Sequence, residues 1–79
     1  MLHVSIHSIE KTLFEGDADS VTLPGVDGEL GILPLHLPLI SSLKRGTINI
    51  HQGREVLFIE IKGGFAEVRP GSQVVVLAN

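Results

Sequence analysis

Hydrophobic and polar residues alternate in several short segments of the chain. In residues 2–7 the even positions are apolar and the odd positions polar, and residues 47–51 repeat this pattern with Ile48 and Ile50. A period of two is typical of a half-buried β-strand. Glycine and proline recur at short intervals and leave no stretch long enough for a long helix. We therefore predict an all-β fold.

Two later segments are apolar on both faces. In residues 56–61, Val56 and Phe58 lie on the face opposite Leu57, Ile59 and Ile61, and residues 74–77 read VVVL. A β-sandwich needs only one face of each sheet to be buried, so a second apolar face requires another covering layer or a partner. These segments predict a docking surface.

The segment from Leu30 to Leu43 contains no charged residue. A membrane-spanning helix needs about 20 apolar residues, and Pro34 and Pro38 would interrupt the hydrogen bonding of a helix here. We predict short extended pieces joined at the two prolines. They carry more leucine than a core of this size requires.

Length and composition narrow the class of protein. The 79 residues are enough for one domain, residues 1–79, and the absence of cysteine excludes disulfide-rich scaffolds and thiolate zinc sites. A net charge of −3, without Trp or Tyr, argues against nucleic-acid binding. The first residues lack the features of a signal peptide, so we expect a soluble, intracellular domain.

The ionisable side chains do not form a recognisable metal site. His3 and His7 share a strand face, but positions four apart on a strand are separated by about 13 Å, too far for one tetrahedral zinc. Glu15, Asp17 and Asp19 alternate without the spacing of a calcium loop, and we interpret them as a solvated strand edge. We expect no bound metal.

No motif for catalysis or cofactor binding is present. The glycines between residues 25 and 31 are spaced G-x-x-G-x-x-G, which is neither a dinucleotide fingerprint nor a P-loop. No serine lies in a G-x-S-x-G elbow, and there is no cysteine nucleophile. We expect no cofactor and no catalytic residue.

One segment resembles a known family. Residues 28–39 read GELGILPLHLPL and are followed by LKRG at 43–46. They resemble the G-x-L-G-x-L-P-x-H-x-P-L pattern of the epsilon subunit of F-type ATP synthases, called delta in mitochondria. The opening strand, a turn at residues 13–16 and residues 63–78 are also similar to the N-terminal domain of that family.

The resemblance implies a fold and a function. It implies a flattened β-barrel or sandwich of two roughly five-stranded sheets, in a non-catalytic rotor subunit of the central stalk. Its partners would be the gamma subunit and the c ring, on the cytoplasmic side of the energy-transducing membrane and without membrane insertion. The family commonly continues into two C-terminal helices, and because this chain ends at Asn79 we expect no nucleotide binding and no inhibitory function.

The resemblance also implies contact residues. Glu29 lies in the turn that meets the polar loops of the c ring, while Ser8, His36 and Ser41 belong to regions that face gamma or the ring. Many members have a small or polar residue at the position of Leu35 and Ala at that of Leu37. We therefore expect a more apolar loop here, with Leu35 and Leu37 as further partner contacts.

Two other small β-domains are alternatives. A biotinyl or lipoyl carrier domain needs a lysine at a hairpin tip, but neither Lys44 nor Lys62 has the Met-Lys or Asp-Lys context that the modifying ligases recognise. An oligonucleotide-binding barrel needs aromatic platforms and a basic groove, whereas acidic residues outnumber basic ones here, nine to six.

Overall fold

The computed structural model describes all 79 residues and consists of strands joined by short turns. Its extents are 26 × 24 × 21 Å. No helix in it could span a membrane. The nine strands are β1 (Leu2–His7), β2 (Thr12–Ala18), β3 (Ser20–Gly25), β4 (Gly28–Ile32), β5 (Leu39–Leu43), β6 (Gly46–Gln52), β7 (Glu55–Ile61), β8 (Gly64–Arg69) and β9 (Gln73–Ala78).

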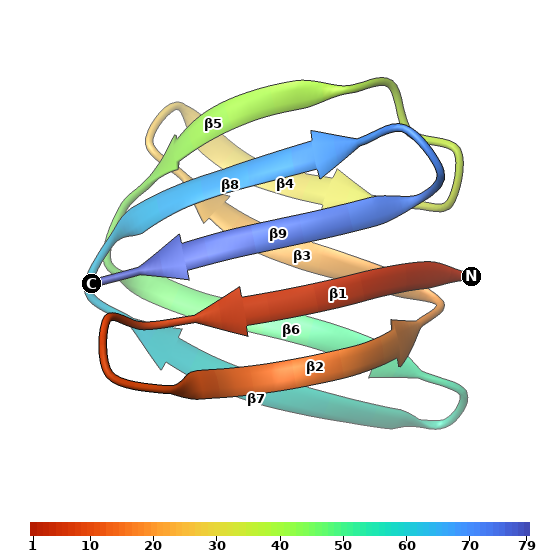
Figure 1. Cartoon of the computed structure of the whole chain (residues 1–79), viewed down its shortest axis with the longest axis horizontal. Coiled ribbons are helices and arrows are strands. Elements are labelled where there is room, and N and C mark those ends of the chain that lie inside the picture. The colour runs from red at the N-terminus through yellow and green to blue at the C-terminus, as the bar shows by residue number, and fades with distance from the viewer.

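The strands form one continuous sheet that folds over itself into two layers. The order is β2-β1-β9-β8-β5-β3-β6-β7, with β4 paired to the other side of β3. Figure 1 shows β5, β8, β9, β1 and β2 in the layer nearer the viewer, and β4, β3, β6 and β7 behind them. The predicted all-β barrel or sandwich is therefore confirmed, with five strands in one layer and four in the other.

The layers are connected through hydrogen bonds as well as through the chain. A single residue pair, Gly25 with Leu43, joins β3 to β5. At the other side the chain passes from β2 to β3 at Asp19, whose amide donates to the carbonyl of His51 at 2.8 Å. Only β1 and β9 run parallel; the other pairs are antiparallel. The result is an almost closed barrel.

The core fills the space between the layers. Sixteen residues form it: Leu2, Val4, Ile6, Ala18, Val21, Leu23, Ile32, Leu43, Ile48, Ile50, Ile61, Ala66, Val68, Val74, Val76 and Ala78. The alternation predicted for residues 2–7 and 47–51 is confirmed, because the apolar positions of both segments are buried. Each large aliphatic side chain so buried contributes roughly 1.5–3 kcal/mol. No charged or polar side chain is in the buried set.

One local expectation was wrong. Residues 13–16 were expected to form a turn, but they lie within β2, and Gly16 pairs with Val4 of β1. The Phe14 ring lies over Gly16, 3.3 Å from the place where a Cβ would stand, so the aromatic ring covers the glycine within the strand. The turn comes earlier, where the Ser8 amide donates to the Lys11 carbonyl at 2.8 Å.

Candidate partner interface

The connection between β4 and β5, residues 33–38, exposes three leucines. Leu33, Leu35 and Leu37 are 63%, 87% and 79% exposed. We call residues 33–38 the leucine loop. The predicted extended pieces are present on either side of it, as β4 and β5, and the excess leucine lies in solvent instead of in the core.

Backbone contacts hold the leucine loop in this shape. The Leu35 amide donates to Ser72 Oγ at 3.0 Å, which ties the loop to the β8–β9 turn. The His36 amide donates to the Leu33 carbonyl at 3.2 Å, and His36 Nδ1 lies 2.7 Å from the Leu37 carbonyl oxygen. Leu35 has φ 67°, a left-handed conformation that is unfavourable for a leucine. The exposed leucines are therefore held at defined positions.

A second apolar area lies on the outer face of the five-stranded layer. Ile40, Phe65 and Leu77 are 76%, 58% and 59% exposed, and Val75 is half-buried beside them. We call these four residues the outer patch. The strand register brings them together, because Phe65 of β8 pairs with Leu77 of β9 and Glu67 pairs with both Ile40 and Val75. They line a shallow hollow of about 170 Å³.

The outer patch continues into the leucine loop. Pro38, the last residue of the loop, and Ile40 line a common hollow of about 300 Å³ with Glu67 and Arg69. Arg69 Nε donates to Glu67 Oε1 at 2.9 Å, so the charged side chains at the border neutralise each other. A largely apolar surface thus runs from the loop across three strands.

A smaller apolar pair lies on the outer face of the other layer. Val56 and Phe58 on β7 are 38% and 68% exposed, as the two-faced pattern of residues 56–61 predicted. Phe58 pairs with Asn49 of β6, whose Oδ1 is buried without a hydrogen-bond partner.

The structure places the predicted contact residues in two groups, with Ser41 apart from both. Leu35, His36 and Leu37 lie together in the leucine loop, next to the β8–β9 turn. Ser8 and Glu29 lie at the opposite end, where the β1–β2 and β3–β4 turns are drawn with the C-terminus (Figure 1). Ser41 is on β5, pairs with the buried Ala66, and shares the inward-facing side with Leu39 and Leu43.

Sequence reasoning missed part of the outer patch. Val75 and Leu77 were predicted from the two-faced pattern of residues 74–77, but Ile40 and Phe65 were not. The sequence does indicate that Phe65 faces outward, because it alternates along β8 with the small core residue Ala66. For Ile40 the signal depended on the pairing of β5 with β8, which no local pattern contains.

A charged cluster lies on the outer face of β1 and β2. His3 Nδ1 is 3.2 Å from Asp17 Oδ1, and His3 Nε2 is 3.5 Å from Glu15 Oε2. The hydrogen bond to Asp17 raises the pKa of His3 above its ordinary value; desolvation opposes this shift, and the contact with Glu15 adds to it. His7 instead contacts Thr12 Oγ1 at 3.2 Å.

No group of three or more ligating side chains is placed to hold a metal ion. The two candidate modification lysines, Lys44 and Lys62, lie in the β5–β6 and β7–β8 connections. No serine hydroxyl is hydrogen-bonded to a histidine in the structure, so the side chains form no arrangement that resembles a catalytic triad.

Comparisons with known proteins agree with this geometry. Residues 1–79 match the family model described as the ATP synthase delta/epsilon chain, β-sandwich domain. The chain is 44% identical over 78 residues to the ATP synthase epsilon chain of Halalkalibacterium halodurans, with 99% of this chain and 58% of the relative covered. It is 51% identical over 81 residues to that of Bordetella parapertussis, with 99% and 56% covered.

Solved structures show the same fold. A chain in a cryo-EM structure of the Euglena gracilis mitochondrial ATP synthase, comprising OSCP, F1 and the c ring, superposes with a TM-score of 0.91 at 20% identity, covering 98% of this chain and 49% of that one. A chain of the Tetrahymena thermophila central stalk and c ring superposes with a TM-score of 0.83 at 17% identity, covering 98% and 62%. The chain spans little more than half the length of the relatives it matches. It belongs to the family of ATP synthase delta/epsilon-chain β-sandwich domains.

Proposed function

We propose that this domain is a non-catalytic part of the central-stalk rotor of an F-type ATP synthase. In this role it is held between the gamma subunit and the c ring and transmits rotation between them. The proposal is supported by the family match over all 79 residues and by relatives that are named ATP synthase epsilon chain. The carrier-domain and oligonucleotide-binding alternatives have no comparable support.

The observation that carries the proposal is the exposed apolar surface outside a complete core. The core already fills the space between the layers, yet the leucine loop and the outer patch keep large apolar side chains in solvent. Contiguous exposed apolar surface on a small domain is typical of protein interfaces. We infer that a partner subunit covers the loop and the patch.

A rotor part that joins two partners needs two contact regions. The leucine loop and the Glu29 turn lie at opposite ends of the domain (Figure 1). We propose that the leucine loop with the outer patch contacts gamma, and that the end carrying Glu29 and Ser8 contacts the polar loops of the c ring. The domain would then be peripheral to the membrane, on its cytoplasmic side, and attached through these partners.

Co-purification tests the proposal. The untagged 79-residue chain is mixed with tagged gamma subunit, and separately with detergent-solubilised c ring, from a species whose epsilon chain is a close relative. We expect a stoichiometric complex with gamma and a weaker association with the ring. If the folded chain elutes free of both partners at micromolar concentrations, the proposed function is wrong.

A further inference from the structure

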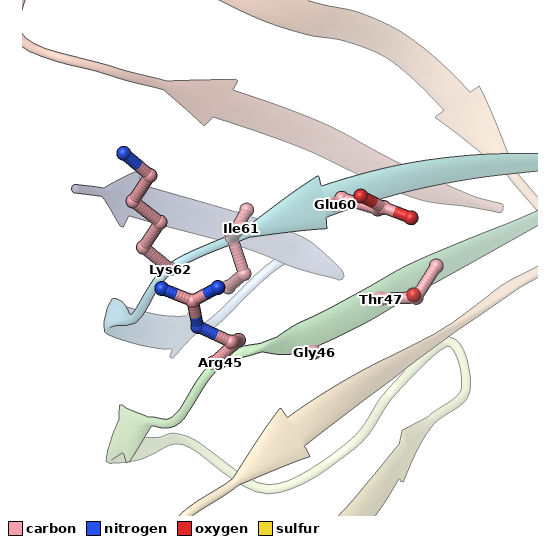
Figure 2. Close-up of a pocket in the computed structure, with 6 residues that line it drawn as sticks. All are labelled: Arg45, Gly46, Thr47, Glu60, Ile61 and Lys62. Atoms are coloured by element: carbon pink, nitrogen blue, oxygen red, sulfur yellow. The ribbon is translucent and has the colours of Figure 1, made fainter.

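Two basic residues flank the paired strands β6 and β7 at the end of the barrel that carries the β5–β6 and β7–β8 connections (Figure 1). Gly46, the first residue of β6, pairs with Ile61, the last residue of β7; Arg45 precedes Gly46 and Lys62 follows Ile61, and both are exposed. They line a hollow of about 410 Å³ together with Gly46, Thr47, Glu60 and Ile61 (Figure 2). This hollow is separate from the leucine loop and the outer patch.

The two cations lack protein partners. The ion pairs of the molecule join His3 to Glu15 and Asp17, and Arg69 to Glu67. Arg45 and Lys62 take part in none of them, and Lys44 adds a third positive charge next to Arg45. Like charges at facing positions of neighbouring strands repel each other, so this arrangement favours an anion between them.

The one acidic residue in the hollow does not neutralise them. Glu60 pairs with Thr47 one step farther along the strands. Figure 2 shows its carboxylate pointing away from the Arg45 guanidinium, while the Lys62 chain lies at the same end of the hollow as Arg45. The lining thus has a positive end and a negative end, with an excess of one positive charge.

We propose that this hollow binds a phosphoryl group between Arg45 and Lys62. A guanidinium offers two parallel donors to phosphate oxygens, and an ammonium supplies a compact second charge. This chemistry differs from a glycine-rich phosphate loop, because the two cations meet only through the pairing of β6 with β7. Since Glu60 opposes the anion, the site is a weak one.

The phosphoryl group has two possible sources with the same chemistry, free phosphate and the headgroup of an anionic phospholipid. The site requires no gamma subunit or c ring, so its test is independent of the proposed function. Chemical-shift mapping of the ¹⁵N-labelled chain provides the readout, with inorganic phosphate added at constant ionic strength maintained by sodium chloride.

We expect saturable shifts confined to the backbone amides of residues 45–47 and 60–62. Arg45→Gln and Lys62→Gln should each weaken phosphate binding at least about threefold, as expected for loss of one exposed ion pair. Glu60→Gln should strengthen binding, which a purely structural role of this carboxylate would not produce. Arg54→Gln, at an exposed arginine in the β6–β7 hairpin at the other end, is the matched control and should bind as the parent does.

Vesicles distinguish the two sources. The site is assigned to a lipid headgroup if the chain sediments with phosphatidylcholine vesicles containing about a third phosphatidylglycerol, but not with phosphatidylcholine alone, and if Arg45→Gln abolishes this sedimentation. The site is assigned to free phosphate if phosphate shifts the amide signals and the chain does not sediment with either kind of vesicle. The proposal is overturned if phosphate gives no saturable shifts at these residues. It is also overturned if acetate gives equal shifts, or if Arg54→Gln weakens binding as much as Arg45→Gln.

Discussion

At the scale of single residues, charges on the surface of β1 and β2 predict a pH-dependent contribution to stability. The Asp17 carboxylate raises the pKa of His3 above its ordinary value of 6.5. Because the folded-state pKa is the higher one, the stabilisation is fully present below pH 6.5 and is lost as the pH rises through the folded-state pKa.

We expect Asp17→Asn to lower the pKa of His3 measured by NMR titration. The variant should also reduce the loss of stability between slightly acidic and slightly alkaline pH. Asp27→Asn, at an exposed carboxylate in the β3–β4 turn, is the control and should leave the His3 titration unchanged. An unchanged His3 pKa in Asp17→Asn would show that the contact does not persist in solution.

The conformation and exposure of Leu35 predict that a polar residue can replace it without loss of stability. Leu35 combines 87% exposure with φ 67°, so its side chain contributes little to folding and its backbone is strained. Asparagine adopts the left-handed region more readily than leucine. Leu35→Asn should therefore keep the free energy of unfolding unchanged or raise it by up to about 1 kcal/mol. A drop of several degrees in Tm would indicate that Leu35 packs against the core.

At the scale of strands, we expect side-chain truncation to reduce stability strongly on the inner face of the sheet and only slightly on its outer face. Ile50 on β6 is fully buried, whereas Ile40 on β5 is 76% exposed. Ile50→Ala should destabilise the domain by about 2–5 kcal/mol, because it leaves a cavity between the layers. Ile40→Ala should change the stability by less than about 0.5 kcal/mol. Urea denaturation of both variants measures the difference, and equal costs would contradict the assigned faces.

Close packing of β8 against β9 predicts a position that only glycine can occupy. Gly64 begins β8 with φ +144°, and a Cβ there would collide with the Leu77 carbonyl oxygen. Gly64→Ala should lower the free energy of unfolding by more than about 2 kcal/mol, because alanine is strained at this φ and its Cβ would collide with the Leu77 carbonyl oxygen. Gly71→Ala is the comparison: it shares a positive φ, +82°, but has open space around it, so its cost should be near 1 kcal/mol.

Local patterns predicted the strands better than their arrangement. The alternation in residues 2–7 correctly indicated the buried face, and the second apolar faces correctly indicated the exposed Phe58 and Leu77, although Leu57, on the face of Ile59 and Ile61, is itself 37% exposed. The turn that the resemblance implied at 13–16 was wrong, because these residues lie in a continuous strand in which Phe14 covers Gly16. Periodicity describes a strand face, but it does not show that the Phe14 ring covers Gly16 two residues later on the same strand.

The candidate interface was predictable only in part for a related reason. The exposed leucines of residues 33–38 follow from an uncharged segment broken by two prolines. The outer patch depends on which strands are neighbours, because Ile40 and Phe65 come from β5 and β8. The contact of His3 with Asp17 likewise depends on the register of β1 with β2. Pairings between distant segments carry no local signature in one sequence.

At the scale of the whole molecule, the residues that stabilise the fold differ from those proposed to bind partners. Its stability resides between the two layers, in the sixteen-residue core, while exposed apolar side chains lie outside, on the leucine loop and the outer patch. A domain of this size buries only about 60% of its unfolded surface and is marginally stable. Substitutions in the exposed surface should therefore affect binding with little effect on folding.

The most direct test of this account is the affinity of Leu37→Asp for the gamma subunit, measured together with its Tm. Leu37 is 79% exposed, so we expect a Tm within a few degrees of the parent and binding weakened at least tenfold, about 1.4 kcal/mol. Arg54→Asp introduces an aspartate at the exposed β6–β7 turn, which lies at the same end as the leucine loop but at the opposite edge (Figure 1), and it should bind normally. Parent-like affinity of a folded Leu37→Asp variant, or loss of its folding transition, would contradict a role of the leucine loop as the exposed contact with gamma.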